Sequence, residues 1–126
     1  MSSINNNTIV LGIAGALNHD ASVSITQGSD IKFAGHAERY SKIKNALQYG
    51  IPDVIAWYEN PYKKKIRQLY AGQYETAFDM DELPKNYLKQ FPELTGIPIE
   101  YQDHHYTHAA SGYHTSGFTH AAVVVI

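Results

Sequence analysis

The sequence predicts an α/β fold with a mixed five-stranded sheet and flanking helices. Two observations predict it. Three short strand-like segments open the chain, with turn residues between the second and the third. A fourth apolar segment then follows a link of 14 residues, 39–52, which just meets the dozen or so residues that a crossover between parallel strands requires. The sheet should therefore combine antiparallel and parallel pairs.

The first three segments predict a strand followed by a β-hairpin. Residues 8–14 (TIVLGIA) form a short, β-branched apolar run that is typical of a buried strand. Residues 21–27 (ASVSITQ) alternate small polar and apolar side chains, as a half-exposed strand should. Residues 28–30 (GSD) have turn chemistry, and strand character resumes over residues 31–38.

The middle of the chain predicts one more strand and short helices. Residues 53–58 (DVIAWY) indicate a buried strand, and the link before it has room for one short helix near 43–49. Pro61 suits a helix start, and residues 62–70 place apolar side chains against basic ones, so an amphipathic surface helix is expected. Residues 71–96 contain two prolines and an acidic stretch, which predicts a surface excursion with one short helix near 85–91.

The last third of the chain predicts a helix between two apolar segments. A short strand is expected at residues 97–101 and an alanine-rich helix at 104–113. Residues 120–126 (HAAVVVI) are apolar without alternation, which is typical of a central strand covered on both faces. Because this run has no charge or proline, it also predicts self-association. Three strands, a crossover, a strand, helices and a final central strand are the order of the ribonuclease-H-like half of an actin-like ATPase lobe.

The composition limits the classes of function. A chain of 126 residues fits one domain, with residues 1–7 expected to form a disordered N-terminus. Lys and Arg total 10 against 12 for Asp and Glu, which argues against a nucleic-acid or membrane-surface binder, since both need a strongly basic face. The chain has no cysteine, which excludes disulfides and thiolate metal sites. It has no signal-peptide pattern and no run of roughly 18 apolar residues, and we expect a cytoplasmic protein.

Five of the seven histidines fall between His104 and His120. His104 and His108 are four residues apart, so on a helix they share one face with Cβ atoms about 5–6 Å apart. Two imidazoles at this spacing can bind one metal ion at roughly 2.0–2.1 Å each. The alternative is that they only cap or decorate a helix start. A zinc-protease motif is excluded because His105 stands where that motif needs its general-base glutamate.

Asn18, His19 and Asp20 form a second polar group, between the first two strands. In this fold that turn faces the cleft where phosphates bind. A histidine there can donate a hydrogen bond to phosphate or remove a proton from a hydroxyl. The alternative is a turn in which Asp20 caps the backbone and His19 is merely exposed.

Residues 38–44 (ERYSKIK) form the third group, at the end of the third strand. Glu38, Arg39 and Lys44 place acidic and basic groups together, and Arg is suited to bidentate contacts with a phosphate-bearing ligand such as an adenylate. The alternative is a run of surface ion pairs.

Together, these motifs resemble the N-terminal region of the NodU/TobZ/CmcH-type carbamoyltransferases, a Kae1-like family of the actin-like (ASKHA) ATPase superfamily. The resemblance covers residues 9–126 and keeps the order of the motifs. They are GIA at 12–14, HDAS at 19–22, AERYSKIK at 37–44, YENP at 58–61 with Lys64, HHYTHAAS at 104–111, and Phe118 with AAVVVI at 121–126.

The resemblance implies an O-carbamoyltransferase. A YrdC-like domain makes carbamoyl adenylate from carbamoyl phosphate and ATP, and the Kae1-like part passes the carbamoyl group to a substrate hydroxyl. It implies a divalent metal, Fe(II)-like with Zn or Mg as possibilities, held by His104 and His108. It also implies that His19 activates the acceptor hydroxyl. The implied binding residues for substrate or nucleotide are Asp20, Glu38, Arg39 and Lys44.

Two departures from the family pattern matter. The link before residue 53 is contracted, and the family continues after the position of residue 126 with an aspartate that is itself a metal ligand. We therefore expect residues 8–126 to be an N-terminal subdomain that lacks the second lobe and the YrdC-like domain, supplied by the same or a separate chain. Alone it should be inactive, with a weakly filled metal site.

Two alternatives stay open. One is a relative that modifies tRNA by threonylcarbamoylation, against which Glu38-Arg39-Tyr40 and the Ala-Ala-Ser after His108 speak. The other is a non-enzymatic interaction module that kept the fold. The sequence leaves the acceptor substrate open.

Overall fold

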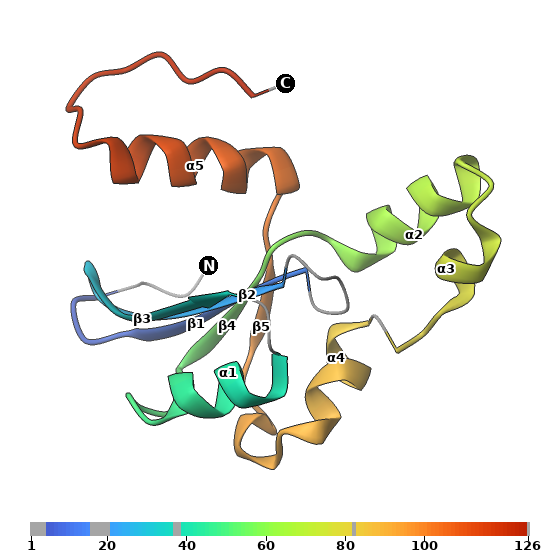
Figure 1. Ribbon diagram of the computed structural model, residues 1–126, viewed down its shortest axis with the longest axis horizontal. Coiled ribbons are helices and arrows are strands. Elements are labelled where there is room, and N and C mark those ends of the chain that lie inside the picture. Colours follow the sequence, from blue (N-terminus) through green and yellow to red (C-terminus); the bar gives the residue numbers. More distant parts are fainter. Residues whose placement is uncertain (1–4, 16–20, 37–38, 82, 126) are drawn as a thin grey trace.

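The computed structural model describes residues 5–15, 21–36, 39–81 and 83–125, with the backbone alone at 39–41. It is a mixed α/β structure around a five-stranded sheet of order β3-β2-β1-β4-β5, as predicted (Figure 1). The strands are β1 (Ile9–Ala14), β2 (Ser22–Gln27), β3 (Asp30–His36), β4 (Val54–Trp57) and β5 (Ile99–Tyr101). The helices are α1 (Arg39–Leu47), α2 (Pro61–Tyr70), α3 (Tyr74–Phe78), α4 (Pro84–Tyr87) and α5 (His104–Ser116), with 3-10 turns η1 (Leu88–Gln90) and η2 (Pro92–Leu94).

The register of β1 confirms the predicted mixture of strand directions. β1 runs antiparallel to β2, with Leu11 opposite Ile25, and parallel to β4, with Leu11 opposite Ile55. The predicted hairpin is also present, because β2 pairs antiparallel with β3 through a turn at Gly28, whose φ is +58°. β5 then adds parallel to β4. The short link through α1 is thus a true crossover.

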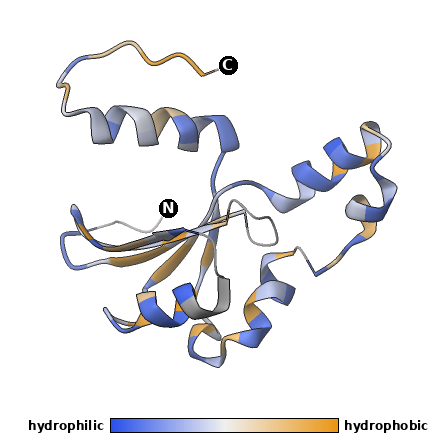
Figure 2. Ribbon diagram, in the orientation of Figure 1, coloured by the Kyte–Doolittle hydropathy of each residue, from blue (hydrophilic) through white to orange (hydrophobic). Residues whose placement is uncertain are grey.

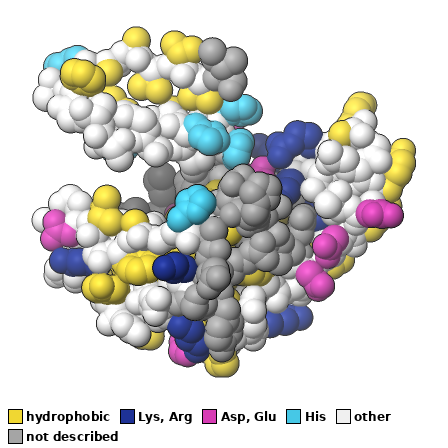
Figure 3. Space-filling view, viewed as in Figure 1, with side chains coloured by type: hydrophobic (Ala, Val, Ile, Leu, Met, Phe, Trp, Pro, Cys, Tyr) yellow, Lys and Arg dark blue, Asp and Glu magenta, His cyan; other side chains and the backbone are white. Residues whose placement is uncertain are grey.

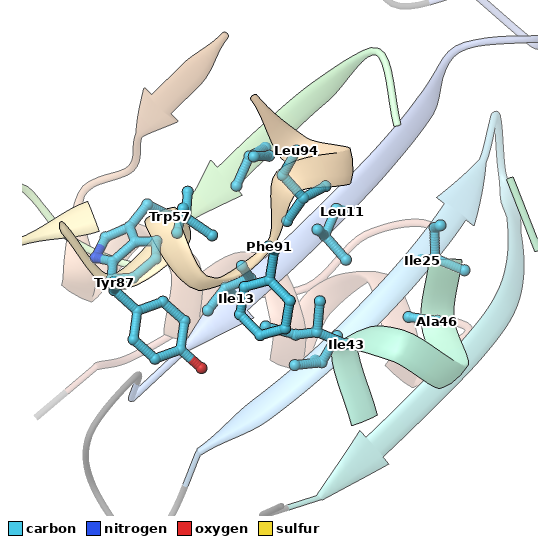
Figure 4. Packing of buried hydrophobic residues seen from close by; sticks show 12 residues of the cluster. Leu11, Ile13, Ile25, Ile43, Ala46, Trp57, Tyr87, Phe91 and Leu94 are labelled. Atoms are coloured by element: carbon cyan, nitrogen blue, oxygen red, sulfur yellow. The ribbon is translucent and has the colours of Figure 1, made fainter. Parts of the chain in front are cut away.

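One face of the sheet carries the hydrophobic core. Alternate strand residues such as Leu11, Ile25 and Ile55 are fully buried there, because successive side chains of a strand point to opposite faces. Figure 4 shows Ile43 and Phe91 packed together against this face. They come from α1 and from the turns around η1, so α1 and the α4–η2 segment form the layer that covers it.

The segment 71–96 differs from the predicted surface excursion. It contains α3, α4 and two 3-10 turns, and its residues Tyr87, Leu88, Phe91 and Leu94 belong to the core. Pro84 and Pro92 each stand at the first position of a helical turn, where a missing N–H costs nothing. The prolines therefore start short helical turns that direct apolar side chains inward.

The opposite face of the sheet is built from small side chains. Neighbouring strands place Ala34, Ser24, Gly12 and Ala56 in one row across it. A Cβ on Gly12 would lie 2.7 Å from Ser24 Oγ, so a larger residue here would require the Ser24 side chain to move. α5 lies over this face, yet none of its thirteen residues, all of them described, is buried. A hollow of about 610 Å³ separates the helix from the sheet (Figure 3).

The prediction of a central strand at residues 120–126 is wrong for the described residues 120–125, which form no strand. The run stays apolar (Figure 2), but α5 lies between it and the sheet, so no strand edge is within reach for pairing. Val124 is 80% exposed. The fifth strand is β5, which the sequence predicted only as a short additional strand. The apolar run predicted a buried strand, but the run itself does not show which neighbouring strand it would pair with.

Outside the strands, the prediction succeeded best where capping signals were strong. α2 begins at Pro61 as predicted, and α5 begins at His104 but continues to Ser116, three residues further. α1 begins earlier than predicted, at Arg39. Of the expected disordered N-terminus, residues 1–4 lie outside the described residues, and residues 5–7 form a turn in which Asn5 Oδ1 accepts from the N–H of Asn7.

Candidate metal centre

The carboxyl ends of the two parallel strands β4 and β5 lie side by side, and a capped helix starts just after each. The side chain of Asn60 accepts hydrogen bonds from the backbone N–H groups of Tyr62 and Lys63 at the start of α2. Asp103 accepts from the N–H of Tyr106 at the start of α5. Ligand sites in α/β sheets gather at this edge, because the chain leaves each strand there.

His104 and His108 lie together at this edge, on successive turns at the start of α5. Their ring centres are 4.7 Å apart and the rings are nearly perpendicular, at 88°. With nitrogen-to-metal bonds of roughly 2.0–2.1 Å, each ring centre would sit about 3 Å from a shared ion, so two rings at this separation can reach it. His105 is exposed, with its ring centre 5.8 Å from that of His104.

One nitrogen of the pair has an unusual environment. His104 Nδ1 is buried and has no hydrogen-bond partner among the described residues. A buried ring nitrogen is normally paired, and an orphaned one is a place where an ion or a water is expected. Imidazole nitrogens are donors that suit a borderline metal such as Zn(II) or Fe(II). Within the described ranges, no group of three or more His, Cys, Asp or Glu side chains is arranged to hold a metal ion.

The two histidines line a hollow of about 350 Å³ that the end of the chain also borders. His105 and Gly112 complete the helix side, and the opposite wall is formed by Val123, Val124 and Val125. After α5 the chain turns back and runs along the helix toward its first turn (Figure 1). Figure 3 shows histidine side chains gathered at that end of the helix. The chain end thus approaches the histidine pair without forming the expected strand.

Beside the histidines lies a charged group to which the sequence analysis gave no role. Glu59, directly after β4, is only 5% exposed. Its carboxylate lies 2.9 Å from Arg67 Nη2 and 3.8 Å from Lys64 Nζ, both on α2. Lys64 Nζ also donates to the Tyr58 hydroxyl at 3.0 Å, and the Tyr58 ring packs edge-on to His104 at 5.9 Å. The sequence did contain a signal for this group, because YENP at 58–61 together with Lys64 is one of the motifs that carry the family resemblance.

Two carboxyl groups at this edge have shifted pKa values. Burial alone would raise the pKa of Glu59, but hydrogen bonds from Tyr58 and Arg67 and the charges of Lys64 and Arg67 outweigh it, and the pKa lies below its ordinary value. The pKa of Asp103 is lowered chiefly by the hydrogen bond from the backbone N–H of Tyr106. Both groups are therefore ionised at neutral pH.

The other predicted site residues are not brought to this centre by the described part of the structure. His19, Asp20 and Glu38 lie outside the described residues. Arg39 begins α1, with its side chain outside the description. Lys44, on α1, forms an ion pair with Glu93 of η2 on the core side of the sheet, whereas α5 lies over the other face. Its nucleotide-binding role remains a prediction.

Comparisons of the chain with protein-family models, with curated proteins and with solved structures gave no match. The assignment of a function therefore rests on the residues and their geometry. Among the described residues, none of the helices has both the length and the apolar character that a bilayer crossing requires.

Proposed function

We propose that this chain is the N-terminal part of an O-carbamoyltransferase, a ribonuclease-H-like half of an actin-like lobe with a metal centre at His104 and His108. The whole enzyme would transfer a carbamoyl group from carbamoyl adenylate, made from carbamoyl phosphate and ATP, to a substrate hydroxyl. The observation that carries the proposal is the pair of rings 4.7 Å apart, one of them with an orphaned nitrogen, at the carboxyl edge of the parallel strands.

The fold supports the same proposal. Three antiparallel strands followed by a crossover to a parallel strand are what the actin-like resemblance implies for the start of such a lobe. The motif residues 58–61 and 104–111 come from segments that are 40 residues or more apart in sequence, yet Tyr58 and His104 are in contact. Motifs of a common site should meet in this way.

The chemistry assigned to the chain's own residues is binding and orientation. His104 and His108 would hold the ion as neutral imidazoles, and His19 would accept the proton of the acceptor hydroxyl. A bound divalent metal supplies Lewis acidity that stabilises negative charge on the reacting group. Asp20, Glu38, Arg39 and Lys44 stay proposed contacts to substrate or nucleotide, and the acceptor itself is unassigned.

The metal centre can be tested by calorimetric titration of the chain with Zn(II) and, without oxygen, with Fe(II). We expect weak binding, because the described donors number two, and loss of the binding signal in both His104→Ala and His108→Ala. His114→Ala is the matched control, since His114 lies at the far end of the same helix and should leave binding unchanged. Tight stoichiometric binding that survives His108→Ala would contradict the proposed centre.

Transfer is tested by complementation. Residues 1–126 alone should neither consume ATP with carbamoyl phosphate nor carbamoylate an acceptor, because the resemblance assigns adenylate formation to a YrdC-like domain. Adding the second lobe and YrdC-like domain of a carbamoyltransferase should restore transfer, and His104→Ala should abolish transfer while adenylate formation continues. Transfer by the purified 126-residue chain alone would overturn this division of the reaction.

A further inference from the structure

Tyr58 is held rigidly at the end of β4. Its backbone N–H donates to the carbonyl of Ile13 at 3.1 Å, which extends the pairing of β4 with β1 by one residue. Tyr58 packs against the core cluster, with its ring centre 6.3 Å from that of Trp57, and it also lines the hollow below α5. From this fixed base its ring meets the ring of His104 at 5.9 Å and 73°.

The far end of the Tyr58 side chain is fixed as well. Its hydroxyl accepts a hydrogen bond from Lys64 Nζ at 3.0 Å and is hydrogen-bonded to the Glu59 carboxylate. Glu59 is in turn held by Lys64 and Arg67, and its side chain is only 7% exposed. Charge-assisted hydrogen bonds of a poorly solvated carboxylate are stronger than neutral ones, so the ring has little freedom to rotate.

The ring of His104 has no comparable anchor of its own. Its backbone is fixed by the Asp103 cap, but neither of its ring nitrogens has a hydrogen-bond partner among the described residues, so the nitrogen that would not bind the ion has no anchor. In metal sites, a hydrogen bond to the second ring nitrogen normally fixes the orientation of a histidine ligand. Here the ring contact with Tyr58 is what restrains His104 from the side of the sheet.

We infer that Tyr58 is a positioning residue that orients His104 toward His108, and that Glu59 and Lys64 act by holding Tyr58. The inference rests on the proposed metal centre. It deepens that proposal by connecting the charged group on α2 to the histidine pair, through one aromatic ring placed at the end of a buried strand.

The test uses the full chain with Zn(II) as the probe and three variants. Tyr58→Leu removes the ring, Tyr58→Phe keeps the ring but releases it from Lys64 and Glu59, and Tyr113→Leu is the matched control. Tyr113 also packs on a histidine of α5, with ring centres 5.3 Å apart from His114, but at the other end of the helix. All are compared at a temperature where circular dichroism shows each variant folded.

We expect Tyr58→Leu to raise the Kd for Zn(II) about ten- to hundredfold, the usual effect of removing an outer support of a ligand. Tyr58→Phe should raise it by less, and Tyr113→Leu should leave it unchanged. In the metal-free chain, the imidazole NMR signals of His104 should shift in both Tyr58 variants while those of His114 stay in place. A purely structural loss would instead move the signals of both histidines.

An unchanged Kd together with unchanged His104 signals in Tyr58→Leu would overturn the inference. Should that variant not fold, Tyr58→Phe decides by the same two measurements. Because the NMR measurement needs no metal, it tests the role of Tyr58 independently of the proposed metal centre. Zn(II) binding that is insensitive to His104→Ala would reject the metal centre, whereas the signals of His104 would still show whether Tyr58 orients its ring.

Discussion

The two faces of the sheet are built from the same five strands and differ in almost every other respect. On the core face, large apolar side chains interlock with α1 and with the turns around Phe91, and several of them are fully buried. On the other face, small side chains lie beneath a helix that buries none of its residues. His104 and His108 belong to this helix, α5. Stability is therefore concentrated on one face and the candidate chemistry on the other.

Substitutions on the core face should have the largest effect on stability. Phe91→Ala should lower the free energy of unfolding by about 3–5 kcal/mol, because it leaves a cavity at a side chain with no exposed surface. Urea denaturation followed by circular dichroism measures the loss. Phe118→Ala is the control, since Phe118 is 68% exposed after α5 and should change the stability little. Equal losses in both variants would remove the distinction between the faces.

Glu59 stands at the boundary between the two regions, and Glu59→Gln should cost about 1–3 kcal/mol at neutral pH. Because the folded-state pKa of Glu59 is lowered, its contribution is full above the unfolded-state pKa and is lost as the pH falls through the folded-state value. The difference between wild type and variant in urea melts should therefore shrink in acid. Glu75→Gln, at an exposed position of α3, is the control. A difference that stays constant down to the acid transition would argue against the charged group.

The cap of α5 gives a smaller and local effect. Asp103→Ala should destabilise α5, because the N–H of Tyr106 loses its acceptor. Hydrogen exchange should accelerate in α5 and stay unchanged in β1, since the helix can open without the core. Asp103→Asn keeps a capping oxygen and should behave nearly as wild type. Equal acceleration in β1 would show that the second face is tied to the core after all.

The smallest effect is expected at the candidate site itself. His108→Ala should change the free energy of unfolding by less than about 0.5 kcal/mol without metal, because His108 is exposed. Thermal melting of the metal-free chain measures this. A loss above about 1 kcal/mol would mean that the histidine has a structural role and would weaken the case for the metal centre.

The strands and two helix starts could be predicted because their signals are local. Alternation in residues 21–27 reflects the period of a half-buried strand, and Asn60-Pro61 is a cap followed by a proline at the first helical position. The spacing of His104 and His108 is likewise local, since it depends only on the helical period. Such patterns depend only on the local backbone geometry and need no tertiary contact.

The errors arose where tertiary partners decide. The apolar run at 120–126 predicted a central strand, which is wrong for the described residues 120–125. A strand also needs a neighbouring strand edge, and no residue pattern within the run shows whether one is near. The turns at 71–96 were assigned to the surface because prolines suggested interruption. Phe91 enters the core only because η1 and η2 place it over β1. Tyr58 and Glu59 were visible as a motif, but the contact of Tyr58 with His104 depends on the pairing of β4 with β5.

The absence of buried side chains on α5 has a consequence for how this protein can evolve. Substitutions along that helix meet little resistance from folding, so selection there acts mainly on whatever the helix binds. Gly12 is more constrained, because an added Cβ would require the Ser24 side chain to move. New specificities should therefore arise more readily by drift on α5 than at Gly12 on the sheet surface beneath it.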